Sequence, residues 1–132
     1  MIPWAKPNYH GYEEKFVRQA LKSTWISDGS FIRNFEKKFS NYVNSKFAIS
    51  VSNGTTAIHL VYLALGLKRG DEIIIPGFGY LAAANIALQM GLKPVFADVD
   101  LKSFCVNEKQ IKKKITNKTK LIVVIHTYGN VC

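Results

Sequence analysis

The residues with the clearest chemical potential form a short turn, Ser52-Asn53-Gly54-Thr55-Thr56, between two apolar segments. A helix that begins in this turn would present unpaired backbone N–H groups and the positive end of its dipole, and the threonine hydroxyls would add donors. Gly54 would let the backbone approach a ligand closely. Such a turn could bind a phosphate or a carboxylate. The same residue types also favour helix starts as simple N-caps, so both interpretations stay open here.

Other candidate residues lie near the ends of predicted strands. Tyr80, beside two glycines, could stack on an aromatic ligand or could be a core or interface tyrosine. His126 could act as an acid or base, although a histidine that ends a buried strand is more often structural, as we expect for His59. Asp98 and Asp100 could form a paired-carboxylate or metal site, but an acidic turn explains them equally well. No metal site is predicted.

The elements that must position these residues follow from the spacing of the apolar residues. Two helices are expected first, and strands and helices then alternate. This alternation favours an α/β fold with three layers, in which a mostly parallel sheet carries helices on both faces and ligands bind at the carboxyl ends of the strands. The predicted elements are helices 8–22 and 31–43, strand 47–51, a buried helix 55–65, strand 72–76, helix 81–90, strand 94–99, a basic helix 107–115 and a doubly covered strand 121–126.

The composition is that of a folded protein. The 132 residues are 48% hydrophobic and 20% charged, which allows one hydrophobic core and argues against disorder. No apolar run approaches the roughly 20 residues that cross a bilayer, and the N-terminus lacks the layout of a signal peptide. We therefore expect a cytoplasmic protein with no membrane partner.

The net charge of +9 admits a nucleic-acid or polyanion partner. The densest lysine cluster, within residues 109–120, fits the solvated face of an amphipathic helix, and no RNA-binding or helix–turn–helix motif accompanies it. No nucleic-acid partner is therefore expected. Cys105 and Cys132 lack CxxC spacing and a nearby histidine pair, so neither a disulfide framework nor a zinc site is predicted.

Taken in order, several segments resemble the DegT/DnrJ/StrS family of pyridoxal-phosphate-dependent sugar aminotransferases. The resemblance runs from about residue 2 to the last residue, and the order and spacing of the segments make it specific. The matching segments are Trp25 to Gly29 with Phe35-Glu36, Ser52 to Leu60, Ala64 to Leu67, Gly70 to Glu72, Pro76 to Asn85, Pro94 to Asp100, and His126 to Asn130.

The resemblance implies pyridoxal 5′-phosphate as the cofactor. The cofactor phosphate would be bound by Gly54, Thr55 and Thr56, and Tyr80 would stack on the pyridine ring, which favours the functional interpretation of both. Four residues of a loop near the sugar-nucleotide site would contribute to substrate binding: Trp25, Ile26, Ser27 and Gly29.

The chain also departs from the family pattern. Gly79 and Ala83 stand where threonines are usual, Asn130 stands where glutamine is common, and Ser30 stands where proline is common. These departures leave the cofactor prediction intact but weaken any prediction of the sugar.

In the family, the lysine that forms a Schiff base with the cofactor and the aspartate beside the pyridine nitrogen follow the segment matching 121–126. Both would lie beyond residue 132, so no catalytic residue is expected here. We expect one incomplete domain over 1–132, with helices and a loop in 1–45 and part of the cofactor-binding α/β domain in 46–132. The chain would be the N-terminal portion of a longer enzyme, through truncation, a split reading frame or fragmentation, and inactive alone.

The whole enzyme, by resemblance, would transfer an amino group from an amino-acid donor to a nucleotide-linked keto-deoxysugar. It would act as a homodimer, or with a companion C-terminal chain, in polysaccharide, O-antigen or antibiotic sugar synthesis. Three alternatives remain: a truncated remnant that binds nothing, a basic module that binds nucleic acid or another polyanion, and a relative that uses the same scaffold for dehydration or regulation.

Overall fold

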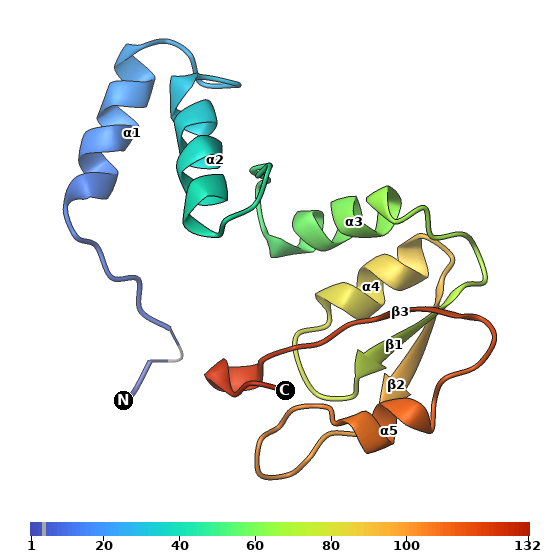
Figure 1. The fold of residues 1–132 in the computed structure, drawn as a ribbon. Helices are drawn as coiled ribbons and strands as arrows, with labels where there is room; N and C mark the ends of the chain where they lie inside the picture. Colours follow the sequence, from blue (N-terminus) through green and yellow to red (C-terminus); the bar gives the residue numbers. More distant parts are fainter. Residues whose placement is uncertain (4) are drawn as a thin grey trace. The chain divides into compact units, whose positions relative to one another are not determined.

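The computed structural model describes residues 1–3 and 5–132 (Figure 1). The chain divides into two compact units, Met1–Ser50 and Val51–Cys132, and each is described by itself. Among the described residues, no helix combines the length and the apolar character needed to cross a membrane.

The first unit contains two helices, α1 (Tyr12–Lys22) and α2 (Ser30–Tyr42), and both were predicted. α1 begins later than expected because Gly11 has a left-handed backbone (φ +86°), which interrupts the helix. The helices contact each other through Phe16 and Phe31, whose ring centroids are 6.1 Å apart in an edge-to-face arrangement. The spacing of the apolar residues therefore predicted both helices correctly, and Gly11 determines where α1 begins.

Residues 47–51 form no strand, so the prediction of a strand there is wrong. A strand is stabilised by ladder hydrogen bonds to a neighbour, and these residues have no ladder partner in the described chain. The backbone N–H of Ser50 instead donates to Oε1 of Glu36 at 2.8 Å, as does the Ser50 hydroxyl. These hydrogen bonds lower the pKa of Glu36.

The second unit is built on a three-stranded parallel sheet in the order β2–β1–β3, which confirms the α/β prediction. β1 (Glu72–Pro76) pairs with β2 (Lys93–Ala97) on one side and with β3 (Thr119–Ile122) on the other, and all five residues of β1 are buried. Beyond β3, the N–H of Val123 still donates to the carbonyl of Ile74 at 2.8 Å. β1 is thus the centre of the sheet.

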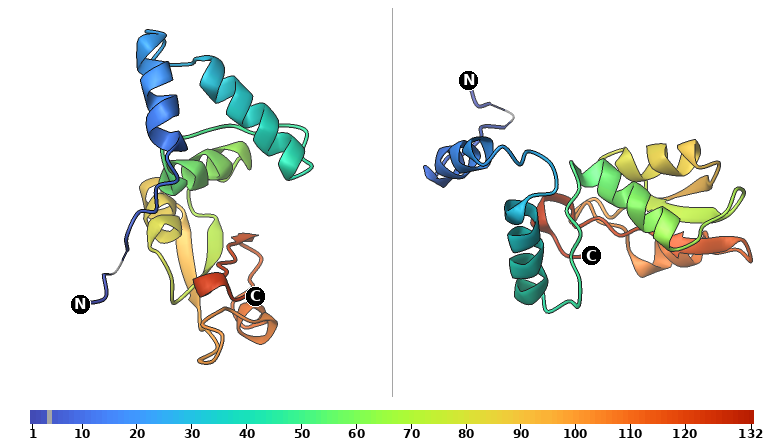
Figure 2. Two further views of the ribbon diagram at one scale, coloured as in Figure 1. Left: turned by 90° about the vertical axis from the view of Figure 1, so that its left-hand side faces the viewer. Right: turned by 90° about the horizontal axis from the view of Figure 1, so that it is seen from above.

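Helices cover both faces of this sheet, as the three-layer prediction requires. Ile73 and Ile75 point to one face, where they pack with residues of α3 (Gly54–Ala64) and α4 (Ala82–Gln89). Ile74 points to the other face and packs with Ala97 and Val106, beside α5 (Glu108–Lys112). Side chains of a strand alternate between faces, so three consecutive isoleucines serve two separate cores. Figure 2 shows the layers from two further directions.

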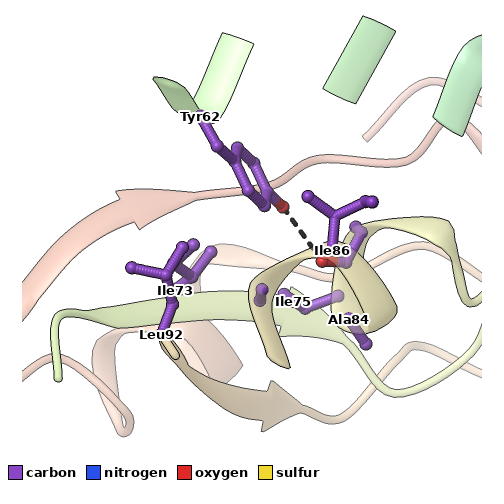
Figure 3. Close-up of a cluster of buried hydrophobic side chains, with 8 residues drawn as sticks. Tyr62, Ile73, Ile75, Ala84, Ile86 and Leu92 are labelled. Carbon is purple, nitrogen blue, oxygen red and sulfur yellow. Dashed lines mark hydrogen bonds between the residues drawn. The ribbon is translucent and has the colours of Figure 1, made fainter. Parts of the chain in front are cut away.

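The larger core joins α3 to α4 above β1 (Figure 3). The Tyr62 side chain is 2% exposed, and its hydroxyl donates to the carbonyl of Ala83 at 3.3 Å. Burial raises the pKa of this phenol. Four of the eight residues of α4 are alanines, and all four are buried, which allows close packing on the sheet. The helix ends before Gly91, whose left-handed backbone (φ +71°) provides the expected helix stop.

Two burial predictions are wrong. α3 was expected to be buried on most faces, but Tyr62 is its one buried residue, and Leu60, Val61 and Leu63 are exposed. β3 was expected to be covered on both faces, but Ile122 and Val124 are exposed. The basic helix ends at Lys112 instead of about Ile115. A hollow of about 530 Å³ lies between this region and the exposed Ile122 and Val124.

Glu72 lies at the start of β1, where each oxygen of its carboxylate accepts a hydrogen bond from a different part of the chain. Oε2 accepts from the Thr116 hydroxyl, and Oε1 accepts from Nζ of Lys93 at 3.0 Å. The Thr116 hydrogen bond, followed by the Lys93 hydrogen bond, lowers the pKa of Glu72 below its usual value. The charged form is therefore favoured by folding, and β1 is tied to β2 and to the turn before β3.

We expect Glu72→Gln to change how stability depends on pH. Because the folded pKa lies below the unfolded value of about 4.3, the charged carboxylate stabilises the native state at neutral pH. This stabilisation falls as the pH drops from about 5 through the lowered pKa. Urea unfolding between pH 3 and pH 7 should show a smaller acid-side loss in Glu72→Gln than in the wild type. Glu14→Gln, at an exposed ion pair, is the control, and identical pH profiles for the wild type and Glu72→Gln would contradict this account.

Candidate functional site

The turn singled out by sequence is the N-terminus of α3. Asn53 is the N-cap residue in an extended backbone conformation, and its Oδ1 accepts from the Thr56 N–H at 2.9 Å and from the Thr56 hydroxyl at 3.1 Å. The N-cap interpretation is therefore correct for Asn53. This cap satisfies the N–H of Thr56 and does not involve the N–H groups of Gly54 and Thr55.

Two backbone donors of this turn remain unpaired. Within residues 1–3 and 5–132, the N–H groups of Gly54 and Thr55 make no hydrogen bond. A Cβ built on Gly54 would meet nothing within 4 Å, so open space lies beside the backbone there. The first turn of α3 thus presents free N–H groups and the positive dipole end to an accessible space, which suits an anion.

That space is a hollow of about 560 Å³ at the carboxyl ends of the strands. It brings three predicted residues together, Gly54, Thr55 and Tyr80, whereas Thr56 does not line it. Tyr80 is 83% exposed, so its ring is not a core residue. The other lining residues are Asn53, Ile58, Ala82, Ala83, Val123, Val124, Ile125 and His126.

The backbone before Tyr80 is shaped by glycine. Gly79 has φ +148°, and a Cβ there would come within 3.0 Å of Cδ1 of Ile125. A glycine therefore allows the loop after β1 to pass close to the segment after β3. This close approach places Tyr80 and His126 around the same hollow.

The histidines differ in position. His126 is exposed beside the hollow, and its Nδ1 accepts from the N–H of Cys132 at 3.1 Å. His59 is half-buried within α3 and lies outside the hollow. His126 therefore accepts one hydrogen bond but is exposed, so it is not the buried structural histidine that the sequence favoured, and it lines the hollow.

The structure favours the acidic-turn interpretation for Asp98 and Asp100. Oδ1 of Asp100 accepts from the backbone N–H groups of Lys102 and Ser103 at 3.0 Å each, and these bonds lower the pKa of Asp100. Oδ1 of Asp98 accepts from the N–H of Val99. In the part of the chain that is described, no three His, Cys, Asp or Glu side chains gather as a metal site would require.

The two cysteines are free thiols. Sγ of Cys105 donates to the carbonyl of Asn130 at 3.3 Å, and Sγ of Cys132 donates to the carbonyl of Ile125 at 3.1 Å. Burial, followed by a hydrogen bond with the Cys105 thiol, raises the pKa of Cys132.

The model of the DegT/DnrJ/EryC1/StrS aminotransferase family matches residues 8–132. The chain belongs to this family. It is 43% identical over 132 residues to GDP-perosamine synthase of Escherichia coli O157:H7 and 41% identical over 133 residues to that of Vibrio cholerae. These matches cover 99% and 100% of the chain but 36% of each relative.

Solved structures agree with this assignment. The aminotransferase from Psychrobacter cryohalolentis superposes with a TM-score of 0.91 at 32% identity, over 98% of this chain and 34% of that one. The E. coli GDP-4-keto-6-deoxy-D-mannose-3-dehydratase, solved with bound hydrated PLP, gives 0.84 at 30% identity, over 92% and 33%. The chain spans about a third of the length of the relatives that it matches. PLP is the cofactor bound in the dehydratase structure of this family.

The hollow fits the shape and charge of this family cofactor. Free N–H groups at one side suit its phosphate, and the exposed Tyr80 ring and the apolar walls of Ile58 and Val123 suit a flat heterocycle. No lysine of the described chain lines the hollow. The hollow therefore offers binding groups and no amine to attach the cofactor.

The remaining predicted site residues lie in the first unit. Trp25, Ile26 and Gly29 line a hollow of about 280 Å³ together with residues of α1 and α2, and Ser27 is exposed in the same loop. Gly29 is buried and is the N-cap residue of α2. Their role in substrate binding stays a prediction.

Sequence reasoning missed two features of the site. It did not include Asn53 among the binding residues, although asparagine is a preferred N-cap and its position before Gly54 carried that signal. It also missed the apolar wall from Val123 to Ile125, which continues past the end of β3. No local sequence signal shows that a strand end will face a helix start distant in the chain.

Substitutions at the two aspartates should separate a turn from a metal site. We expect Asp100→Asn to lower the melting temperature more than Asp98→Asn. The carboxylate of Asp100 accepts hydrogen bonds from two backbone N–H groups, whereas that of Asp98 accepts from one. Thermal unfolding by circular dichroism measures this difference. Added Mg²⁺ or Mn²⁺ should leave the wild-type melting temperature unchanged, and a rise that both substitutions abolish would restore the metal-site interpretation.

Proposed function

We propose that this chain supplies the cofactor phosphate site and the ring-stacking residue of a PLP-dependent aminotransferase acting on nucleotide-linked keto-deoxysugars. The observation that carries the proposal is the hollow shared by Gly54, Thr55 and Tyr80. An anion site and an exposed aromatic ring beside one apolar space match a ligand that joins a phosphate to a flat heterocycle. The relatives named as sugar-nucleotide enzymes support the substrate class.

Each residue contributes to binding and orientation. The N–H groups of Gly54 and Thr55 would donate to the phosphate, and the Tyr80 ring would lie against the heterocycle. Ile58 and Val123 would exclude water from the remaining side. When bound, PLP supplies an electron sink that stabilises charge developing on a substrate carbon. The residues of this chain would fix where that chemistry takes place.

The catalytic amine would come from outside the described hollow. The chain has fifteen lysines, and none of them lines the hollow in the part of the chain that is described. We propose that the whole enzyme uses an amino-acid donor and works as a homodimer or with a companion chain. The single-domain assignment over 1–132, the roles of Thr56, Trp25, Ile26, Ser27 and Gly29, and a cytoplasmic location stay predictions.

Dehydration is the second candidate reaction, because a dehydratase of known structure shares 30% identity and the same fold. Both reactions would use the same phosphate site and the same stacking ring. The nature of the product distinguishes them: an aminosugar for transfer, and a deoxygenated ketosugar for dehydration.

Ligand binding tests the proposal directly. The aldehyde of PLP reacts with surface lysines, so the suitable probe is pyridoxine 5′-phosphate, which carries an alcohol in its place. We expect this probe to bind the chain and pyridoxine, which lacks the phosphate, to bind at least tenfold more weakly. Calorimetric titration of the two compounds measures the ratio. Equal binding, or none, would contradict a phosphate site at α3.

Tyr80→Ala should weaken the binding of pyridoxine 5′-phosphate about 2- to 12-fold, because an aromatic pair contributes roughly 0.5–1.5 kcal/mol. Its melting temperature should stay near the wild-type value, since the side chain is 83% exposed. Tyr42→Ala is the matched control, because Tyr42 is 87% exposed and lies in the first unit. An equal effect of both substitutions on binding would exclude a specific role for Tyr80.

A further inference from the structure

The two cysteines of the chain lie on one hollow, although they belong to different segments. Cys105 lies in the loop between β2 and α5, and Cys132 lies beyond β3, yet both line the hollow of about 530 Å³ beside Ile122 and Val124. The side chain of Cys105 is buried, with 2% exposed, whereas Cys132 is exposed. The fold therefore brings together one buried and one accessible thiol that are 27 positions apart in the sequence.

Hydrogen bonds connect the two segments that carry the thiols. Sγ of Cys105 donates to the carbonyl of Asn130 at 3.3 Å, and Nδ2 of Asn130 donates to the carbonyl of Ser103 at 3.0 Å. The loop that contains Cys105 is itself closed by an antiparallel bridge between Val99 and Val106. Asn130 thus ties an ordered loop to the segment that reaches Cys132 two residues later.

The position of Cys132 is fixed by its own hydrogen bonds. Its N–H donates to Nδ1 of His126 at 3.1 Å, and its Sγ donates to the carbonyl of Ile125 at 3.1 Å. Burial, and then the neighbouring Cys105 thiol, raises the pKa of the Cys132 thiol. Groups influence each other's ionisation in this way only at short range, so the two thiols are neighbours.

We propose that Cys105 and Cys132 form a reversible disulfide, which makes this pair a redox-sensitive modification site of the second unit. The inference goes beyond the proposed function, because neither thiol lines the hollow assigned to the cofactor. It also revises the sequence prediction of no disulfide, because the spacing of these cysteines does not show that the fold places them on one hollow.

The difference in exposure gives the thiols different roles. The accessible sulfur of Cys132, as a thiolate, attacks one sulfur of a small-molecule disulfide such as oxidised glutathione. The S–S bond of the oxidant breaks, one glutathione leaves as a thiolate, and Cys132 carries a mixed disulfide. The sulfur of Cys105 then attacks the Cys132 sulfur, and the second glutathione leaves. The protein thiols lose two electrons and two protons, and the oxidant becomes two molecules of reduced glutathione.

The disulfide should stabilise the second unit. It would close a loop that contains α5 and β3, and such a closure removes conformations from the unfolded chain. Oxidation also removes the two S–H donors, so the carbonyls of Asn130 and Ile125 lose these partners. An S–H group is a weak donor, so this loss is small. We therefore expect the melting temperature to rise by about 5–15 °C.

Oxidation of the purified chain tests the proposal. The chain is incubated with excess oxidised glutathione, and its intact mass, its peptide map and its thermal melt are recorded before and after reduction with dithiothreitol. We expect the wild type to lose two hydrogen atoms, to yield a linked peptide that contains Cys105 and Cys132, and to melt at the higher temperature. Dithiothreitol should reverse all three changes.

Two single substitutions separate the roles of the thiols. Cys105→Ser keeps the accessible thiol and lacks the second sulfur, so it should accumulate one glutathione on Cys132. Cys132→Ser keeps the buried thiol, which should react with the oxidant about tenfold more slowly. Equal rates of modification in the two variants would contradict the proposed order of attack.

The wild-type measurements decide the proposal without the variants, so a substitution that prevents folding leaves the test intact. A wild-type chain that stays reduced, or that stops at the mixed disulfide, would overturn the proposal. A disulfide that joins two chains would also overturn it. An oxidised chain that melts below the reduced chain would show that the bond distorts the fold, and this result too would contradict a site built into the native structure.

Discussion

The structure of the second unit depends on one strand that is buried on both faces. β1 presents Ile73 and Ile75 to the core beneath α3 and α4, and Ile74 to the core beside α5. Because it is central, its backbone is paired on both sides, to β2 and to β3. β1 is therefore held by backbone pairing on both edges and by packed side chains on both faces.

The parallel direction of the strands explains how residues far apart in sequence meet at one edge. The start of α3, the loop after β1 and the end of β3 supply Asn53, Tyr80 and His126 to a single hollow. In parallel sheets, the carboxyl ends of strands share an edge, and the helices that follow or precede them start there. The site thus results from strand direction, and the α3 cap adds the local order that an anion requires.

Much of this fold could be predicted from sequence, because the decisive signals are local. The run Glu72–Pro76 has the apolar, β-branched residues of a buried strand. Asn107 marks the start of one helix and Gly91 the end of another by their backbone preferences.

The prediction of a strand at 47–51 was wrong because a strand requires a hydrogen-bonded partner, and local sequence does not show whether one is present. The prediction that Leu60 and Ile122 are buried was wrong for the same reason. An apolar side chain tends to be buried, but the sequence does not show which residues would pack against it. Which of the two threonines Asn53 caps was also beyond sequence, since an N-cap side chain can accept from either of the two positions and only the geometry shows that it accepts from Thr56.

The glycine at position 79 has an evolutionary consequence. The branched side chain of Ile125 occupies space that a residue larger than glycine would need at position 79. The two positions are therefore in contact, although they are 46 positions apart in the sequence. A side chain at position 79 would therefore require another backbone angle there and a shift of the Ile125 side chain. The residue types tolerated at the two positions should accordingly depend on each other, and the shape of the hollow that Tyr80 and Ile125 line should depend on both.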